Sequence, residues 1–79
     1  MSTLDYINNL FNEIDKRFNG KVSYSYNENT NRVKIGFYNK LTADTATKLI
    51  LITNGFERLT YNGFTVTENN EIVFTYTLK

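Results

Sequence analysis

The side chains that most often carry out catalysis are absent from this chain of 79 residues. It contains no histidine and no cysteine, which removes the usual general base and the thiolate nucleophile. Ser23 and Ser25 alternate along an expected strand, without the glycine-flanked turn that exposes a nucleophilic serine. Glu13 and Asp15 lie two residues apart on an expected helix, so their carboxylates point in different directions. We therefore expect a protein that is not an enzyme.

Metal and phosphate sites have little support in the sequence. The segment Asn27-x-Asn29-x-Asn31 has the spacing of a calcium loop, but it lacks the glycine at the sixth position. Tyr38 also stands where such a loop needs a bidentate glutamate. Three of the four glycines follow an asparagine, as is typical of turns and helix ends, and they form no phosphate-binding loop. We expect no cofactor and no metal.

A modestly basic patch is the candidate site for binding a partner. The expected outer face of a β-hairpin carries three basic residues and a tyrosine, and two more basic residues end the helix before it. These candidate residues are Lys16, Arg17, Lys21, Arg32, Lys34 and Tyr38. Sheets that bind single-stranded nucleic acid combine such charge with several exposed aromatic rings, whereas Tyr38 is the one clear outer-face ring here. The net charge of +1 also favours a protein partner over nucleic acid.

The hairpin that would hold this patch is indicated by two runs of strict alternation. Val22, Tyr24 and Tyr26 alternate with polar residues in the first run, and Val33 begins a similar second run that continues to Phe37. Period-two alternation around a polar loop predicts a half-buried hairpin, with strands near 21–27 and 32–38. Gly36 interrupts the outer face of the second strand, which indicates a bulge or a close backbone approach.

Two helices are expected, one before this hairpin in the sequence and one after it. The first spans about 3–18, where the apolar residues Leu4, Ile7, Leu10, Phe11, Ile14 and Phe18 form a stripe at helical spacing. Thr3 is its expected N-cap, and Asn19-Gly20 supplies a left-handed residue to end it. The second helix begins after Thr42 and ends before Asn54-Gly55. Its expected buried stripe is Ala43, Ala46, Leu49 and Ile50, extended by Ile52 or Thr53.

The last third of the sequence predicts two or three strands. Asn62-Gly63 lies between apolar alternations and favours a hairpin turn at that point. After the turn at Glu68-Asn69-Asn70, the alternation of Ile72, Phe74, Tyr76 and Leu78 predicts a final strand. The segments 18–38 and 61–78 share an aromatic-Asn-Gly start and an Asn-rich turn, which suggests a duplicated unit. Two hairpins that obey the same rules would explain the likeness equally well.

These elements indicate an α+β fold in the order α-ββ-α-ββ(β). One four- or five-stranded antiparallel sheet with two helices packed on one face covers every apolar stripe. We expect a single domain over residues 1–79, with six Phe and six Tyr supplying much of its core. Tyr6, Tyr38 and Tyr61 are the aromatic residues that this arrangement leaves least well buried.

A small binding protein that acts stoichiometrically on a macromolecular partner is the expected function. The size of the chain and its lack of catalytic groups resemble small phage-encoded inhibitors of host defence, such as anti-CRISPR proteins. That resemblance implies a host protein as partner and the host cytoplasm as location. No apolar run approaches the roughly 20 residues that span a bilayer. The alternatives are a weak binder of single-stranded nucleic acid through the basic outer face, and a self-assembling structural or virion subunit; the chain is expected to be a monomer or a homodimer.

Overall fold

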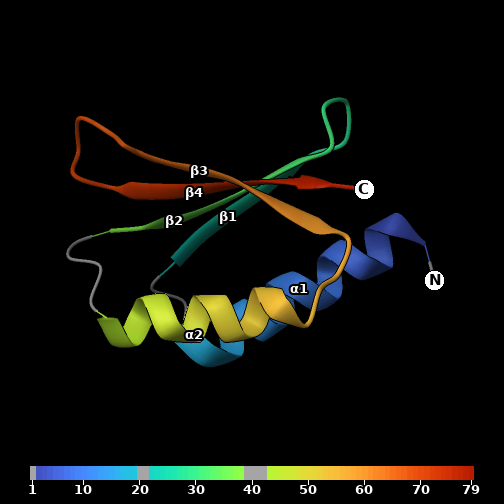
Figure 1. Ribbon diagram of the computed structural model, residues 1–79, viewed down its shortest axis with the longest axis horizontal. Helices are drawn as coiled ribbons and strands as arrows, with labels where there is room; N and C mark the ends of the chain where they lie inside the picture. Colours follow the sequence, from blue (N-terminus) through green and yellow to red (C-terminus); the bar gives the residue numbers. More distant parts are fainter. Residues whose placement is uncertain (1, 20–21, 39–42) are drawn as a thin grey trace.

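Two helices lie on one face of a four-stranded antiparallel sheet (Figure 1). The computed structural model describes residues 2–19, 22–38 and 43–79. Along the chain, the elements are α1 (Thr3–Phe18), β1 (Val22–Asn27), β2 (Arg32–Phe37), α2 (Ala43–Asn54), β3 (Leu59–Val66) and β4 (Ile72–Leu78). The expected α+β arrangement is confirmed with four strands, and the described residues hold no fifth strand.

The sheet has the strand order β1-β2-β4-β3, so β1 and β3 are its edges. Each hairpin pairs its own strands, and β2 joins the hairpins by pairing with β4. Because paired residues point to the same face, Val33 shares a face with its partners Tyr26 and Tyr76. The face that carries them is apolar and turned toward the helices. The opposite face, which we call the outer face, carries Lys34 and its partners Ser25 and Thr75.

The first helix has the expected bounds, but its N-cap differs from the expectation. Ser2 is the N-cap, because its Oγ accepts a hydrogen bond from the Asp5 backbone N–H at 3.1 Å. Thr3 is instead the first helical residue. At the other end, Asn19 adopts the expected left-handed conformation, with a φ of 52°, and its N–H bonds to the Asp15 carbonyl.

The second helix buries only part of the expected stripe. Leu49 and Ile52 are its buried residues, whereas Ile50 is 57% exposed and Ala43 is also exposed. Four consecutive apolar residues, 49–52, surround the helix, so spacing alone does not decide which of them meets the core. The expected cap at Thr42 lies outside the described residues.

The expected turn at Asn62-Gly63 is wrong. β3 runs through both residues as one strand, and a β-bulge shifts its register between Tyr61 and Gly63. Gly63 has a φ of +118°, which a residue with a side chain rarely adopts. β4 pairs along both sides of the bulge, so the Asn-Gly pair is accommodated within the strand instead of reversing the chain. The C-terminal third therefore contains two strands.

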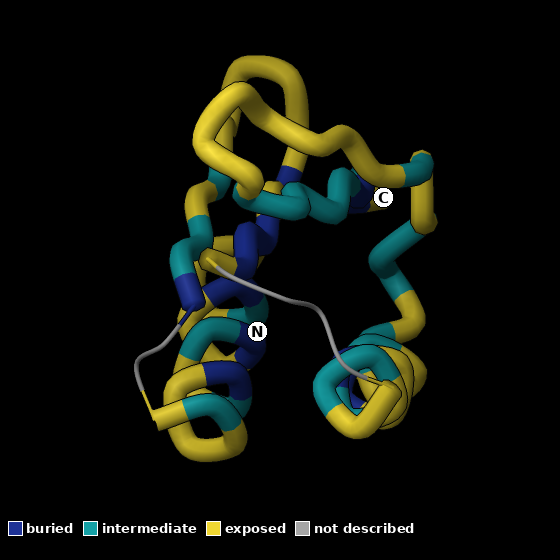
Figure 2. The backbone as a smooth tube through the Cα atoms, turned by 90° about the vertical axis from the view of Figure 1, so that its left-hand side faces the viewer, coloured by how far each residue is buried: buried dark blue, intermediate teal, exposed yellow. Residues whose placement is uncertain are grey.

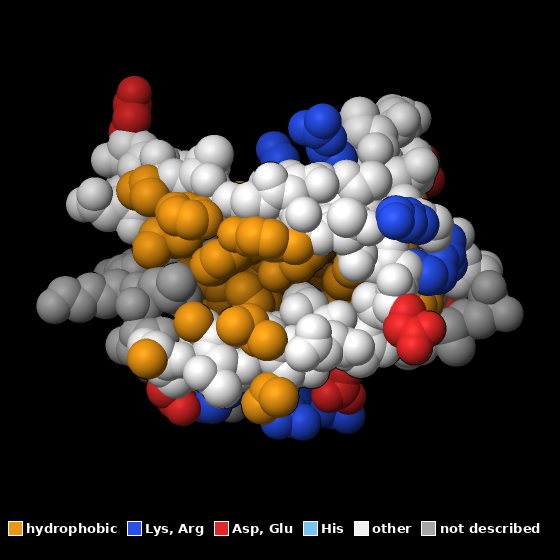
Figure 3. Space-filling model, in the orientation of Figure 1, with side chains coloured by type: hydrophobic (Ala, Val, Ile, Leu, Met, Phe, Trp, Pro, Cys, Tyr) orange, Lys and Arg blue, Asp and Glu red, His pale blue; other side chains and the backbone are white. Residues whose placement is uncertain are grey.

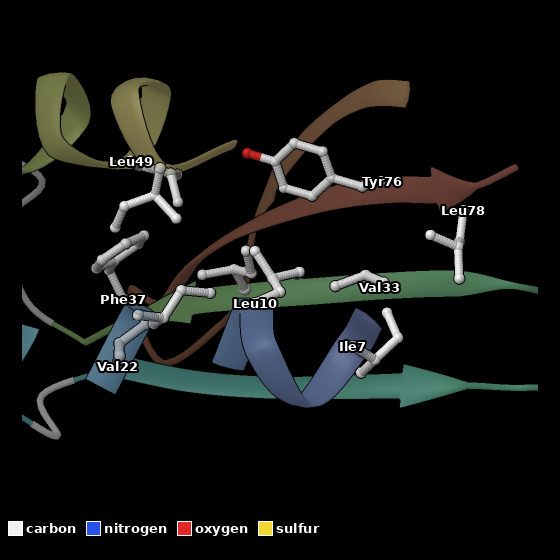
Figure 4. Close-up of a cluster of buried hydrophobic side chains, with 11 residues drawn as sticks. Ile7, Leu10, Val22, Val33, Phe37, Leu49, Tyr76 and Leu78 are labelled. Carbon is white, nitrogen blue, oxygen red and sulfur yellow. The ribbon is translucent and has the colours of Figure 1, made fainter. Parts of the chain in front are cut away.

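The core lies mainly between α1 and the sheet. Figure 2 shows both helices on the same side of the sheet, with buried segments where α1 faces it. The buried hydrophobic residues come from five of the six elements, and the deepest lie on α1 and β2 (Figure 4): Ile7, Leu10, Ile14, Val22, Val33, Ile35, Phe37, Leu49, Ile52, Tyr76 and Leu78. β3 contributes Leu59 to the margin of this core and no fully buried residue.

Candidate functional site

The structure brings together part of the predicted basic patch. Arg32 and Lys34 are exposed on the outer face of β2, two residues apart. Both line a surface depression of about 710 Å³ beside the β1–β2 turn, together with Glu28. Tyr38 follows β2 directly and is 57% exposed. Lys21 lies outside the described residues.

The two helical members of the patch lie on the other side of the sheet. Lys16 and Arg17 are in the last turn of α1, which packs against the apolar face (Figure 1). Lys16 forms an exposed ion pair with Glu13, at 3.8 Å, along the helix. These two residues therefore do not share a face with Arg32 and Lys34.

A carboxylate reduces the positive character of the outer face. The Ser23 hydroxyl lies 3.4 Å from both the Glu71 Oε1 atom and the Gly36 carbonyl oxygen. A Cβ atom on Gly36 would collide with the side chains of Ser23 and Glu71. The glycine therefore accommodates two side chains, in place of the bulge or close backbone approach that was expected. Glu71 lines the same shallow depression as Lys34. The negative charge of Glu71 therefore opposes binding of a phosphate backbone beside Lys34.

An exposed apolar surface lies elsewhere, between α2 and the β3 edge of the sheet. We call it the α2–β3 groove. It has a volume of about 390 Å³, and Figure 3 shows a band of hydrophobic side chains along it. Its lining residues carry no charge: Ala46, Leu49, Ile50, Thr53, Asn54, Tyr61, Phe74 and Tyr76.

The bulge in β3 determines which side chains border this groove. Tyr61 pairs with Tyr76, and Phe64 pairs with Phe74, so both face the helices despite the odd spacing between them. In a regular strand without a bulge, residues three apart such as Tyr61 and Phe64 would point to opposite faces. Val66 follows on the same face. All three side chains remain more than half exposed, at 54%, 59% and 60%.

Tyr76 forms part of the groove floor and is 5% exposed. Figure 4 shows its hydroxyl directed toward α2. Burial raises the pKa of this phenol to about 12, although a hydrogen bond with Thr53 on α2 acts in the opposite direction. The floor is therefore neutral at physiological pH, which suits contact with an apolar surface.

Tyr24, the other tyrosine with a shifted pKa, connects the edge strand β1 to α1. The Tyr24 hydroxyl donates a 2.6 Å hydrogen bond to Asp15 Oδ2. This bond, and then desolvation, raises the pKa of Tyr24. The Tyr24 ring also stacks on Phe11, with centroids 4.2 Å apart. Tyr24 is thus a structural residue, not a free aromatic ring for a ligand.

The described residues hold no cluster of three or more side chains of the metal-binding types. No charged side chain is buried in them either. Neither of the two helices combines the length and the apolar character needed to cross a membrane, as judged over the described part of the chain. The α2–β3 groove, lined largely by hydrophobic side chains that include two tyrosines, is a surface suited to contact with a partner.

The sequence pattern did not identify the residues that border the groove as a site. Tyr61 was expected to be poorly buried, but Ile50 was assigned to the core and Phe64 to a separate short strand. Two signals were present. Four apolar residues in a row on a short helix exceed what one buried stripe requires, and a glycine inside a strand pattern indicates a bulge as well as a turn.

Comparison of the chain with protein-family models, with curated proteins and with solved structures gave no match.

Proposed function

We propose that this chain is a non-enzymatic protein that acts by stoichiometric binding of a protein partner, and that the α2–β3 groove is the binding surface. The observation that carries the proposal is the gathering of exposed hydrophobic side chains on one side of the molecule. Ile50 lines the groove from α2 and Tyr61 lines it from β3. Phe64 lies beside the groove, with its ring centroid 6.0 Å from that of Phe74 in the lining. Ile50, Tyr61 and Phe64 are each more than half exposed.

Such a surface is costly to leave in water. Burial of apolar area contributes about 25 cal/mol per Å², and a contiguous exposed apolar patch often marks a protein interaction site. Tyrosine and phenylalanine are enriched at the centres of interfaces, and charged residues are depleted there. The lining of the groove has this composition.

Matched substitutions on α2 test the proposal. Ile50 and Leu51 are adjacent and similarly exposed, at 57% and 63%, but only Ile50 lines the groove. The wild-type chain, immobilised and exposed to host lysate, is expected to retain one discrete protein in a stoichiometric complex. Ile50→Asp should lose that protein, and Leu51→Asp should retain it. Retention by Ile50→Asp, or the absence of any bound protein, a second copy of the chain included, would contradict the proposal.

A phage-encoded inhibitor of a host defence protein, such as an anti-CRISPR protein, is the finer form of this proposal. It is supported by the small size and by the absence of histidine and cysteine. Such an inhibitor acts by occupancy, so titration of the chain into a purified host defence reaction should end at a fixed molar ratio. A graded effect with no end point would exclude this form and leave the binding proposal in place.

Binding of single-stranded nucleic acid at the outer face is a second candidate. Its support is the placement of Arg32 and Lys34 in one exposed depression, and the nearby Glu28 and Glu71 oppose it. Fluorescence anisotropy with a labelled single strand tests it, because phosphate contacts make affinity fall steeply with salt. An affinity unchanged by Lys34→Glu would exclude this candidate.

A further inference from the structure

We propose that the occupant of the α2–β3 groove is a second copy of this chain, which forms a homodimer with the two grooves facing each other. This inference rests on the proposed function, because it names the partner of the same surface. It draws on three properties of the groove: its charge, its area and its shape.

The charge of the groove permits a copy of itself as partner. In a twofold interface each surface patch meets the same patch of the other copy, so any lining charge would face its own sign. Like charges brought together in an interface oppose association. No residue that lines the groove is charged, and neither Phe64 nor Val66 adds a charge beside it. Two copies can therefore approach without electrostatic repulsion from the contact surface.

The exposed area is close to what a stable dimer needs. Ile50, Tyr61, Phe64 and Val66 are 54% to 60% exposed. At side-chain areas of about 150–250 Å², these fractions leave roughly 450 Å² of apolar surface open to water. Specific interfaces bury about 800 Å² per partner and homodimer interfaces are about 65% apolar, so a standard interface needs roughly 520 Å² of apolar surface from each copy. The exposed apolar surface of these four residues approaches that area.

The shape of the groove allows the raised side chains at the borders of one copy to fit over the floor of the other copy. Ile50 on α2 and Tyr61 on β3 stand on opposite sides, while Leu49 and Tyr76 lie buried at the base. A twofold axis through the groove would bring the raised side chains of each copy over the floor of the other. β3 is also an edge strand, so no other strand of the same chain blocks this approach.

The molar mass of the chain in solution tests the inference. Size-exclusion chromatography with light scattering, and sedimentation equilibrium over a range of concentrations, should give twice the mass of the 9.2 kDa chain. Phe64→Asp and Ile50→Asp should each raise the dimer dissociation constant by about tenfold or more. Leu51→Asp, an equally exposed position outside the groove, should leave it unchanged. A monomer at about 1 mM, the weakest affinity worth measuring, would overturn the inference, as would equal weakening by Leu51→Asp.

A second measurement is independent of the effect of a charge on folding. The chain has no cysteine, so a single thiol can be placed at either position. Alkylation of Phe64→Cys should slow as protein concentration rises, whereas alkylation of Leu51→Cys should not. Equal rates at all concentrations would overturn the inference.

The same variants separate this inference from the proposed function. A monomeric chain whose Ile50→Asp variant loses a heterologous partner would refute the dimer and retain the groove as a binding surface. A dimer broken by Phe64→Asp would support both.

Discussion

The two edges of the sheet direct similar aromatic side chains toward the helices, but these side chains are covered at one edge and exposed at the other. At the β1 edge, Tyr24 stacks on Phe11 of α1 and donates a hydrogen bond to Asp15. At the β3 edge, Tyr61 and Phe64 face the same side of the sheet, yet more than half of each is exposed. The difference lies in the helix beneath each edge and not in the strands themselves.

The helices differ in how many of their apolar residues they bury in the core. α1 is longer and buries Ile7, Leu10 and Ile14 in a single stripe, in one core cluster with residues of β1 and β2. α2 lies against α1 and buries two residues, which leaves Ile50 facing an open groove. One half of the apolar sheet face is thus closed by the chain itself. The other half is available to a partner, and its exposure follows from the position of α2.

The largest expected effect lies in the closed half. Leu10 on α1 is fully buried, so Leu10→Ala should reduce the free energy of unfolding by about 2 to 5 kcal/mol. Urea denaturation monitored by circular dichroism measures it. Leu51→Ala is the control for loss of the same side chain at an exposed position, and it should change stability by less than about 0.5 kcal/mol. Similar losses from both variants would contradict the contrast between the halves.

Alkaline pH should weaken the floor of the open half. The pKa of Tyr76 is about 12 in the folded chain and about 10 when unfolded. The raised value means that the neutral phenol is favoured by folding. Its contribution is complete below pH 10 and is lost as the pH rises to about 12, by about 2 kcal/mol. Between pH 10 and 12, the free energy of unfolding of Tyr76→Phe, measured by urea titration, should fall less than that of the wild-type chain. Parallel pH profiles of the two proteins would contradict the raised pKa of Tyr76.

Removal of the bulge residue should be tolerated. Asn62 is the extra residue between Tyr61 and Gly63, so its deletion leaves a regular strand in which Tyr61 and Phe64 still face the helices. We expect a change of less than about 1 kcal/mol, including loss of the Asn62–Thr77 side-chain hydrogen bond.

The matched control is deletion of Thr60. That deletion shifts Leu59 to the outer face and should destabilise the chain much more, as measured by thermal unfolding. If the two deletions cost the same, the assignment of the bulge would be wrong.

The smallest expected effect lies on the open face itself. Phe64 is 59% exposed, so Phe64→Ser should alter the stability of the chain by less than about 0.5 kcal/mol at concentrations where it is monomeric. Urea denaturation in dilute solution checks this. A loss comparable to that of Leu10→Ala would mean that β3 belongs to the closed core.

Local pattern was sufficient for most of the secondary structure. The apolar stripe of α1, the left-handed Asn19 and the alternation of β1, β2 and β4 each depend on residues close together in the chain. The α+β arrangement follows, because each apolar face needs cover from another element. The same reasoning failed at Asn62-Gly63, where the residue types suit both a hairpin turn and a bulge.

Pairing with β4 resolves that ambiguity, and it is a long-range contact that no local pattern contains. The basic residues illustrate the same limit. Lys16 and Arg32 carry the same charge and were assigned to one patch. The sheet separates them, because α1 packs on the apolar face of the sheet and Arg32 lies on the outer face.

The sequence by itself determined which residues are apolar and which elements they form, since period and end signals act locally. Only the tertiary structure decided which apolar side chains are covered. The run of apolar residues at 49–52 presents a hydrophobic side chain in every direction around α2. Its packing against α1 then buries Leu49 and Ile52 and leaves Ile50 beside the exposed face of β3.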